Sequence, residues 1–294
     1  MGNFKKTLLI VIAAGAMALA GLFYIVPAFR GDIEVRGEWF IGPVRLSVYG
    51  LLFALAIVLG YALVRRGLPR VGLARSVADD VILWLVVGGL MGARIYHVFF
   101  SLDYYRAHWL EAIEIYRGGL SIYGAMAGGI VAMILFARWK KIDLLRSLDV
   151  VALVLPLAQS LGRWGNFFNR EAFGLPTDLP WKLYIPPASR PTVFLQESFF
   201  HPTFLYESLW DLAVFYVVWR VLSVSYAATP DRPGFTAGTY LVLYAAGRFL
   251  IESLRIDSYI VAGLKVDQIS SLLAIVLGSL LMWRSYARTN LATR

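Results

Sequence analysis

The 294-residue sequence contains no cysteine and only three histidines. It therefore cannot form a disulfide framework, a thiolate metal site or a cysteine nucleophile. It also has no His-Glu-x-x-His pair, Gly-x-Ser-x-Gly elbow or Walker loop, so the usual signatures of zinc hydrolysis, acyl-enzyme chemistry and nucleotide-driven transport are missing. We expect neither a metal nor a cofactor.

Charged residues are also scarce. They make up 16% of the chain, whereas hydrophobic residues make up 59%, and the mean hydropathy is +0.65. This composition is typical of membrane proteins. The net charge is +9, but the basic residues lie in short loops between apolar runs rather than on one surface. The pattern therefore argues against nucleic-acid binding.

Eight apolar segments approach the length of about 20 residues that a helix needs to cross a bilayer. They are Thr7–Phe29, Leu46–Val64, Val81–Phe100, Gly118–Ala137, Leu148–Trp164, Thr203–Val221, Phe235–Leu254 and Val266–Trp283. We therefore predict an all-α fold, a polytopic membrane helix bundle. Residues 1–30 form either a retained transmembrane helix or a cleaved signal peptide, and the length of the apolar run favours retention. Residues 31–294 form the main membrane domain.

The distribution of lysine and arginine predicts the topology. The loops that lie on the side of the N-terminus carry the excess of basic residues, which places both termini in the cytoplasm. The longest outer loop, residues 166–201, is rich in proline and aromatic residues, so we expect an ordered cap over the outer membrane face. Ser101–Arg117 alternates aromatic and charged residues, which favours an interfacial helix.

Four arginines lie inside the predicted spans or at their ends, namely Arg94, Arg163, Arg220 and Arg248. Arg220 sits at a cytoplasmic end, where we expect an anchor. The other three fall in the outer halves of their helices and therefore at a similar depth. Arginines so deep usually face a protein interior or a wet cavity and have a partner. Glu252, four residues after Arg248, is the expected partner of that arginine.

A polar stretch, Leu161–Gly174, follows the fifth apolar run. Arg163 and Asn166 are three residues apart and so share a helical face, and the glycines between Leu161 and Gly174 allow backbone or ligand to approach closely. Tyr49 and Tyr123 fall at the same level in other spans. Arginines, amides and tyrosines together suit the binding of a phosphate and the stabilisation of charge that grows on it when a bond breaks.

Four stretches of the chain then resemble one known family. Gly162–Gly174, GRWGNFFNREAFG, is similar to the signature of the bacterial prolipoprotein diacylglyceryl transferases. Gly118–Gly124, His201–Glu207 and Tyr244–Glu252 fit further motifs of that family in the same order. The resemblance runs from about Ile41 to the last span.

The resemblance implies a fold and a reaction. The family has a seven-helix body in the bacterial inner membrane, to which Thr7–Phe29 would add a further helix, and its active site faces the periplasm beneath the cap loop. Its members transfer the diacylglyceryl group of phosphatidylglycerol to the lipobox cysteine of a preprolipoprotein and release glycerol phosphate. This is the first step of lipoprotein maturation. The expected partners are therefore phosphatidylglycerol, the preprolipoprotein signal peptide and the lipid bilayer.

The resemblance also implies site residues. Arg163 and Arg248 match the arginines that hold phosphatidylglycerol and support catalysis, and Tyr123 stands where many relatives have a histidine that has been proposed as the general base. Because tyrosine ionises only near pH ~10, we expect Tyr123 to orient the substrate. The remaining substrate-binding candidates are Tyr49, Arg94, Gly124, Asn166, Asn169, Glu171, Gly174, His201, Tyr244, Glu252 and Arg255. Glu171 is either a catalytic carboxylate or the partner of a nearby arginine, and Asp149 matches a family position with a structural role.

Two other classes of function fit buried arginines. The chain could transport or flip an anionic lipid, or it could be a structural subunit whose arginines serve helix packing. A conduit requires polar residues through its full depth, whereas the inner halves of the predicted spans carry only Asp79, Asp80 and Asp149 near the cytoplasmic border. The sequence therefore favours a transferase.

Overall fold

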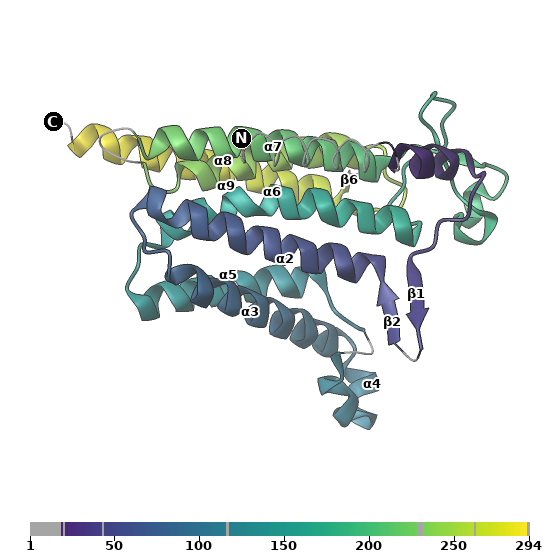
Figure 1. Cartoon of the computed structure of the whole chain (residues 1–294), viewed down its shortest axis with the longest axis horizontal. Helices are drawn as coiled ribbons and strands as arrows, with labels where there is room; N and C mark the ends of the chain where they lie inside the picture. The colour runs from purple at the N-terminus through teal and green to yellow at the C-terminus, as the bar shows by residue number, and fades with distance from the viewer. Residues whose placement is uncertain are drawn as a thin grey trace, which may run out of the picture. The chain divides into compact units, whose positions relative to one another are not determined.

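The structure is a computed structural model that describes residues 19, 21–42, 44–115, 118–227, 232–261 and 263–292. Within these residues helices dominate, and the three small sheets each have two strands (Figure 1). The predicted all-α class is confirmed. The apolar composition of the long segments is the reason, because a backbone in lipid must satisfy its own hydrogen bonds and a helix does so within one segment.

The long helices follow one another along the chain, and the longest connection lies between α6 and α7. They are α2 (Val48–Gly67), α3 (Val77–Phe100), α5 (Ile122–Lys140), α6 (Leu144–Asn169), α7 (Thr203–Ser225), α8 (Phe235–Glu252) and α9 (Val266–Ala292). The strands are β1 (Glu38–Ile41), β2 (Val44–Ser47), β3 (Leu183–Tyr184), β4 (Phe199–Phe200), β5 (Ile260–Val261) and β6 (Leu264–Lys265). The short helices are η1 (Leu68–Val71), α4 (Leu102–Ala107), η2 (Trp109–Ile113), η4 (Pro187–Ser189) and η5 (Thr192–Phe194).

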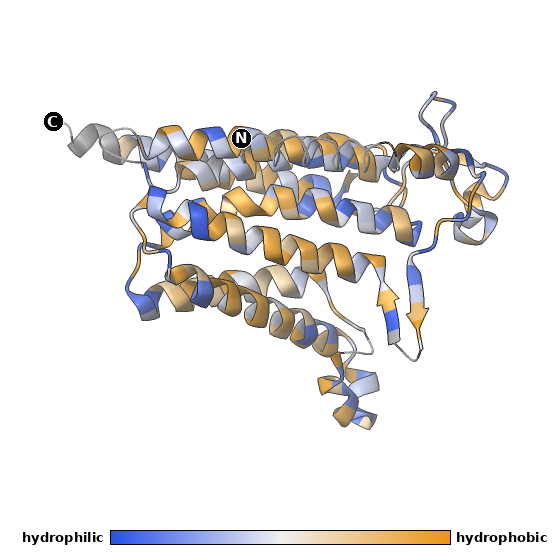
Figure 2. Cartoon of the chain, in the orientation of Figure 1, coloured by the Kyte–Doolittle hydropathy of each residue, from blue (hydrophilic) through white to orange (hydrophobic). Residues whose placement is uncertain are grey.

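Six of the described helices are long and apolar enough to cross a membrane. They are Val48–Val71, Val77–Phe100, Ile122–Lys140, Leu144–Asn169, Thr203–Ser225 and Val266–Ala287. Apolar residues dominate the ribbons of α2, α3 and α5 in Figure 2. The chain is therefore a multi-pass membrane protein.

Two predicted spans are not among these six. The predicted span Phe235–Leu254 is helical, as α8, but its polar and charged residues, Arg248 and Glu252 among them, reduce its apolar character. The predicted span Thr7–Phe29 lies largely outside the described residues, which include a shorter apolar helix at Gly21–Arg30. Whether the first segment is a retained helix or a signal peptide stays a prediction.

The predicted interfacial helix Ser101–Arg117 is broken into two. Its described part forms α4 and η2, separated at His108. Past this break, the guanidinium of Arg94 binds the backbone carbonyls of Glu111 and Ala112. Those carbonyls are then satisfied by a side chain rather than by a continuing helix.

The segment between α6 and α7 has a small core of its own. β3 pairs with β4 in antiparallel register, Leu183 opposite Phe200 and Tyr184 opposite Phe199. The buried apolar residues around this sheet are Ala28, Phe167, Phe173, Leu183, Ile185, Phe200 and Phe204. The aromatic residues that argued against disorder in this loop are the ones that fill this core.

The described residues fall into two compact units. The first draws on Met1–Leu55, Gln159–Leu212 and Ala245–Leu273, and the second on Ala56–Ala158, Ala213–Tyr244 and Ala274–Arg294. The first unit contains the small core described above. The second has an apolar core built from α2, α3, α5, α6, α7 and α8, with Val71, Phe136, Val218 and Leu222 fully buried.

Asp149 has the structural role expected for it, within the second unit. Its carboxylate is fully buried and accepts hydrogen bonds from the backbone N–H groups of Gly234 and Ala237, each at 2.7 Å. The hydroxyl of Tyr226 donates to it at 2.6 Å. Because the first N–H groups of a helix have no helical partner and carry partial positive charge, this carboxylate caps and stabilises the start of α8.

Helices α3 and α5 contact each other at glycines. The two helices lie side by side in the second unit (Figure 1). A Cβ added at Gly92 would contact the carbonyl oxygen of Gly124 and lie 2.7 Å from the Cα of Gly128, and one added at Gly88 would lie 3.1 Å from the carbonyl oxygen of Gly128. The helices approach so closely because neither presents a side chain there.

We expect Gly92→Ala to destabilise the protein, because its methyl group would force the backbones of α3 and α5 apart, at a cost of about 1–3 kcal/mol. The matched control is Gly129→Ala, since a Cβ at Gly129 meets nothing within 4 Å. That change should be neutral or slightly stabilising, because alanine favours a helix over glycine. Thermal unfolding of both variants in detergent measures the difference, and equal midpoints would contradict the close contact.

Candidate active site

The C-terminal part of α6 and the first turns of α7 are joined by a buried ion pair. Arg163 Nε lies 2.7 Å from Glu207 Oε2, and the Glu207 side chain is 4% exposed. A carboxylate removed from water loses several kcal/mol of hydration, so it requires a well-placed cation. The Arg163 guanidinium supplies that charge within the first unit.

Glu207 also contacts the second arginine of the predicted pair. Its Oε1 binds Nη1 of Arg248 on α8 and lies 3.5 Å from Nη1 of Arg255, which follows that helix. One carboxylate therefore joins guanidinium groups from three segments. Arg163 and Arg248, which we predicted to converge on one anionic group, converge on a carboxylate of the protein itself.

Arg248 has two further carboxylate partners. Its Nη2 lies 2.8 Å from Oε2 of Glu252, one helical turn further along α8, and it also contacts Asp267 at the start of α9. The expected Arg248–Glu252 pair is confirmed. Glu252 is 1% exposed and also accepts the hydroxyl of Ser258. The side chain of Arg248 is thus fixed by acids from α7, α8 and α9.

The segment after α8 continues this network. Arg255 binds Asp257 in a bidentate manner, with Nε–Oδ1 and Nη2–Oδ2 distances of 3.0 and 2.6 Å. Burial opposes the ionisation of Asp257, but the hydrogen bonds and charge of Arg255 outweigh it and hold the pKa of this carboxyl below its usual value. Lys265 Nζ donates to the carbonyls of Glu252, at 2.7 Å, and of Arg255. This lysine caps the C-terminal end of α8, where carbonyls lack helical partners.

Two asparagines and a glutamate that follow Arg163 form a small group of their own. Asn166 Nδ2 and Asn169 Nδ2 each donate to Glu171 Oε1 at 3.1 Å. The described contacts of Glu171 are therefore with amides, and they leave its two predicted roles open. The group orients the end of α6, where the chain turns away from the helix.

Gly174 fixes the segment that follows this turn. Its N–H donates to the carbonyl of His201 at 2.9 Å, and an added Cβ would lie 2.8 Å from the carbonyl oxygen of Leu254. Only glycine leaves room for these two backbones. His201 Nδ1 lies 3.2 Å from the hydroxyl of Tyr206, and partial burial lowers the pKa of His201. The candidates Gly174 and His201 therefore link the segment after α6 to the residues just before α7 and just after α8.

Tyr49 packs directly on α6. A Cβ added at Gly165 would contact the ring of Tyr49, with Cε2 at 2.6 Å. The close approach predicted for the glycines of this stretch is thus made by a tyrosine side chain of α2. The same kind of contact occurs at Gly247 of α8, against the indole ring of Trp210.

Arg94 belongs to the second unit and binds the backbone. Its Nε donates to the carbonyl of Ala112 at 2.8 Å, and its Nη1 donates to the carbonyls of Gly118 and Gly119 at 2.8 and 3.1 Å. The side chain is also buried, with its guanidinium 5.3 Å from the ring centre of Tyr105. Arg94 therefore positions the segment that leads into α5, the helix to which Tyr123 belongs.

The other three candidates of the second unit have different surroundings. Tyr123 is 56% exposed, and its ring centre lies 6.4 Å from that of Tyr96. Gly124 contacts the backbone of α3. Tyr244 is partly buried, and its ring packs near the core of that unit. None of these contacts assigns a substrate to the residues, so their predicted roles remain predictions.

The sequence analysis overlooked two acids of α7, Glu207 and Asp211. Both are buried, at 4% and 1% exposure. The signal was present, because two acids four residues apart in an apolar span share a helical face and require partners. We use the name arginine cluster for the charged residues assembled here: Arg163, Glu207, Asp211, Arg248, Glu252, Arg255, Asp257, Lys265 and Asp267.

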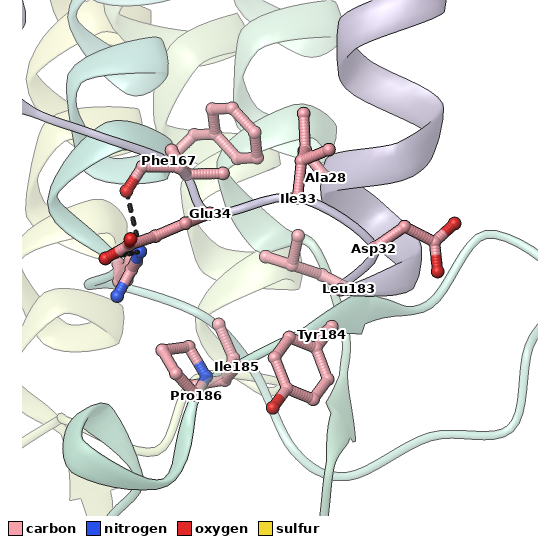
Figure 3. Close-up of a pocket in the computed structure, with 12 residues that line it drawn as sticks. Ala28, Asp32, Ile33, Glu34, Phe167, Leu183, Tyr184, Ile185 and Pro186 are labelled. Atoms are coloured by element: carbon pink, nitrogen blue, oxygen red, sulfur yellow. Dashed lines mark hydrogen bonds and ion pairs between the residues drawn. The ribbon is translucent and has the colours of Figure 1, made fainter.

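A pocket of about 290 Å³ lies elsewhere in the first unit (Figure 3). It is lined by Ala28, Gly31, Asp32, Ile33, Glu34, Val35, Phe167, Arg170, Leu183, Tyr184, Ile185 and Pro186. Arg170, in a left-handed backbone conformation, donates to the carbonyl of Val35 at 2.6 Å. None of the predicted site residues lines this pocket. Within the described ranges, no group of three or more histidine, aspartate or glutamate residues is arranged to hold a metal ion.

Comparison with known proteins identifies the family of the chain. The family model for prolipoprotein diacylglyceryl transferase matches residues 38–284. The chain is 41% identical to the phosphatidylglycerol–prolipoprotein diacylglyceryl transferase of Thermotoga maritima over 280 residues, which cover 93% of this chain and 94% of that protein.

Two further relatives have the same name. The protein of Thermosynechococcus vestitus is 43% identical over 84% of this chain and 91% of its own length. The protein of Fervidobacterium nodosum is 38% identical over 97% of both chains. With the family model covering most of the chain and the charged motifs folded into one buried cluster, the chain belongs to the prolipoprotein diacylglyceryl transferase family.

Proposed function

We propose that this protein transfers the diacylglyceryl group of phosphatidylglycerol to the lipobox cysteine thiol of a preprolipoprotein and releases glycerol phosphate. The family and the names of its relatives support the reaction. The observation that carries the proposal is the convergence of Arg163 and Arg248 on the two oxygens of one carboxylate. Guanidinium groups so arranged are spaced to share one anionic group, as the binding of a lipid phosphate requires.

The proposed step is a displacement at the glycerol carbon. The cysteine sulfur forms a bond to that carbon, and the bond from the carbon to the phosphate oxygen breaks with its electron pair on the oxygen. The leaving phosphate therefore gains negative charge. Arg163 and Arg248 stabilise that charge more strongly in the transition state than in the bound lipid, which lowers the barrier.

The thiol must lose its proton during this step. A free thiol ionises near pH ~8.5, so a part of it is thiolate at neutral pH, and nearby guanidinium groups raise that part. Tyr123 then needs no role as a base and orients the substrate. The sulfur comes from the substrate, which is why a chain without cysteine can perform the reaction.

The other candidates support binding. Glu252 and Arg255 hold Arg248 and Glu207 in place through the contacts described above. Six of these candidates shape the end of α6, namely Asn166, Asn169, Glu171, Gly174, His201 and Tyr49. The other three, Arg94, Gly124 and Tyr244, contribute to the packing of the second unit. The protein would act in the bacterial inner membrane, with its site toward the periplasm.

Purified full-length protein, phosphatidylglycerol and a lipobox peptide test the proposal directly. Mass spectrometry should show a gain of one diacylglyceryl group on the cysteine peptide. A peptide with serine in place of that cysteine is the control and should gain nothing. An unmodified cysteine peptide in the presence of folded protein would count against the transferase and favour transport or a structural role.

Arg163→Ala and Arg248→Ala should each abolish measurable transfer, a loss of at least about 10²-fold, because each removes a donor from the leaving phosphate. The control is Arg220→Ala, since Arg220 is an exposed arginine of α7. Its turnover should match that of the unmodified protein. Full activity of Arg163→Ala would refute the leaving-group role.

Tyr123→Phe should retain measurable turnover, because it keeps the ring that orients the substrate and removes only the hydroxyl. The rate constant and the KM for phosphatidylglycerol, measured with the same peptide, check this. A loss as large as that of the arginine variants would instead assign the hydroxyl to proton transfer.

A further inference from the structure

Asp211 differs from the other carboxyl groups of the arginine cluster. It lies on α7, one helical turn after Glu207, and is 1% exposed. Arg163, Glu207 and Arg248 are near enough to act on it electrostatically. Nevertheless, its Oδ2 accepts no hydrogen bond from any residue that the structure describes. The other carboxylates of the cluster each contact a guanidinium group.

The charges of the cluster do not balance if every acid is ionised. The cations are Arg163, Arg248, Arg255 and Lys265, and the acids are Glu207, Asp211, Glu252, Asp257 and Asp267. The acids would then exceed the cations by one. The phosphodiester of phosphatidylglycerol brings a further negative charge into a buried site, where uncompensated charges interact much more strongly than in water. A fully ionised cluster therefore opposes the ligand.

One proton removes this excess. An ionised carboxylate that is buried without a partner is costly, and a proton removes most of that cost. Asp211 is the acid to which this argument applies, because its Oδ2 has no described partner whereas the other four acids have direct cationic contacts. With Asp211 neutral, four carboxylates face four cations in the state that binds the lipid.

We propose that Asp211 holds a proton when the lipid phosphodiester binds, and that it thereby sets the charge of the arginine cluster for an anionic substrate. Asp211 is a positioning residue, because it acts through the arginines and not on the reacting atoms. The inference rests on the proposed function only in taking the ligand to be a phosphodiester lipid. It makes binding of that lipid depend on pH.

Full-length protein in detergent micelles provides the first test. In the unmodified protein the KM for phosphatidylglycerol should rise with pH, by up to about tenfold per unit, because one proton is linked to one bound lipid. Asp211→Asn keeps the shape of a neutral carboxyl group but cannot ionise. Its KM should stay close to the low-pH value of the unmodified protein and should no longer rise with pH.

Asp178→Asn is the control. Asp178 is an exposed acid outside the arginine cluster that pairs with Lys182 at 3.3 Å, so its replacement should leave the pH dependence of KM in place. The proposal is overturned if folded Asp211→Asn is inactive, or if it keeps the pH dependence of the unmodified protein. Size-exclusion profile and thermal midpoint establish that the variant is folded.

A second measurement requires no variant and no peptide. Calorimetric titration with short-chain phosphatidylglycerol, repeated in buffers of different ionisation heat, gives the number of protons taken up per bound lipid. We expect net uptake with phosphatidylglycerol and none with phosphatidylcholine, which is zwitterionic. Binding with no uptake between about pH 6 and 9 would refute the inference.

These outcomes separate the inference from the proposed function. Proton uptake on lipid binding without transfer to the peptide would support the role of Asp211 and contradict the proposed transferase reaction. Transfer without proton uptake would support the reaction and contradict the role of Asp211.

Discussion

The contact on which the candidate site depends is the one between Glu207 and the guanidinium groups of Arg163 and Arg248. Each of these side chains comes from a different helix, and each would be costly to bury alone. Together they satisfy one another, and Glu252, Asp267 and Arg255 extend the network from α8, α9 and the segment between them. Because the charges compensate one another across helices, the polar residues of α6 can remain within an apolar protein.

This arrangement changes how anion binding should be understood. The arginines are not bare cations that wait for a phosphate, because a carboxylate of the protein already occupies the place between them. In the proposed function, phosphate oxygens must therefore share or replace the contacts that Glu207 makes with Arg163 and Arg248 in the structure.

Local patterns in the sequence predicted much of this fold. The long helices and the Arg248–Glu252 pair both depend on spacing along one segment, which hydropathy and helical periodicity report directly. Glu207 is different, because its significance lies in which other helices bring cations to it. That information is carried by the tertiary fold, so Glu207 was passed over although it ends a motif that the sequence analysis quoted.

Arg94 shows a related limit. Its depth in an apolar span indicated a partner, and the prediction took that partner to be a substrate. The structure gives it the backbone carbonyls of Ala112, Gly118 and Gly119 as partners. Hydropathy cannot distinguish these two solutions, because carbonyl acceptors are available from any sequence.

Both ends of α8 are held by side chains from other segments. Asp149 of α6 holds the start, and Lys265 holds the end. A helix whose dipole is complemented at each terminus by a fixed opposite charge resists fraying and axial sliding. Arg248 therefore belongs to a helix whose two ends are both held by charged side chains. Because such a helix has little freedom to move, we expect the room for a bulky lipid to come from other elements.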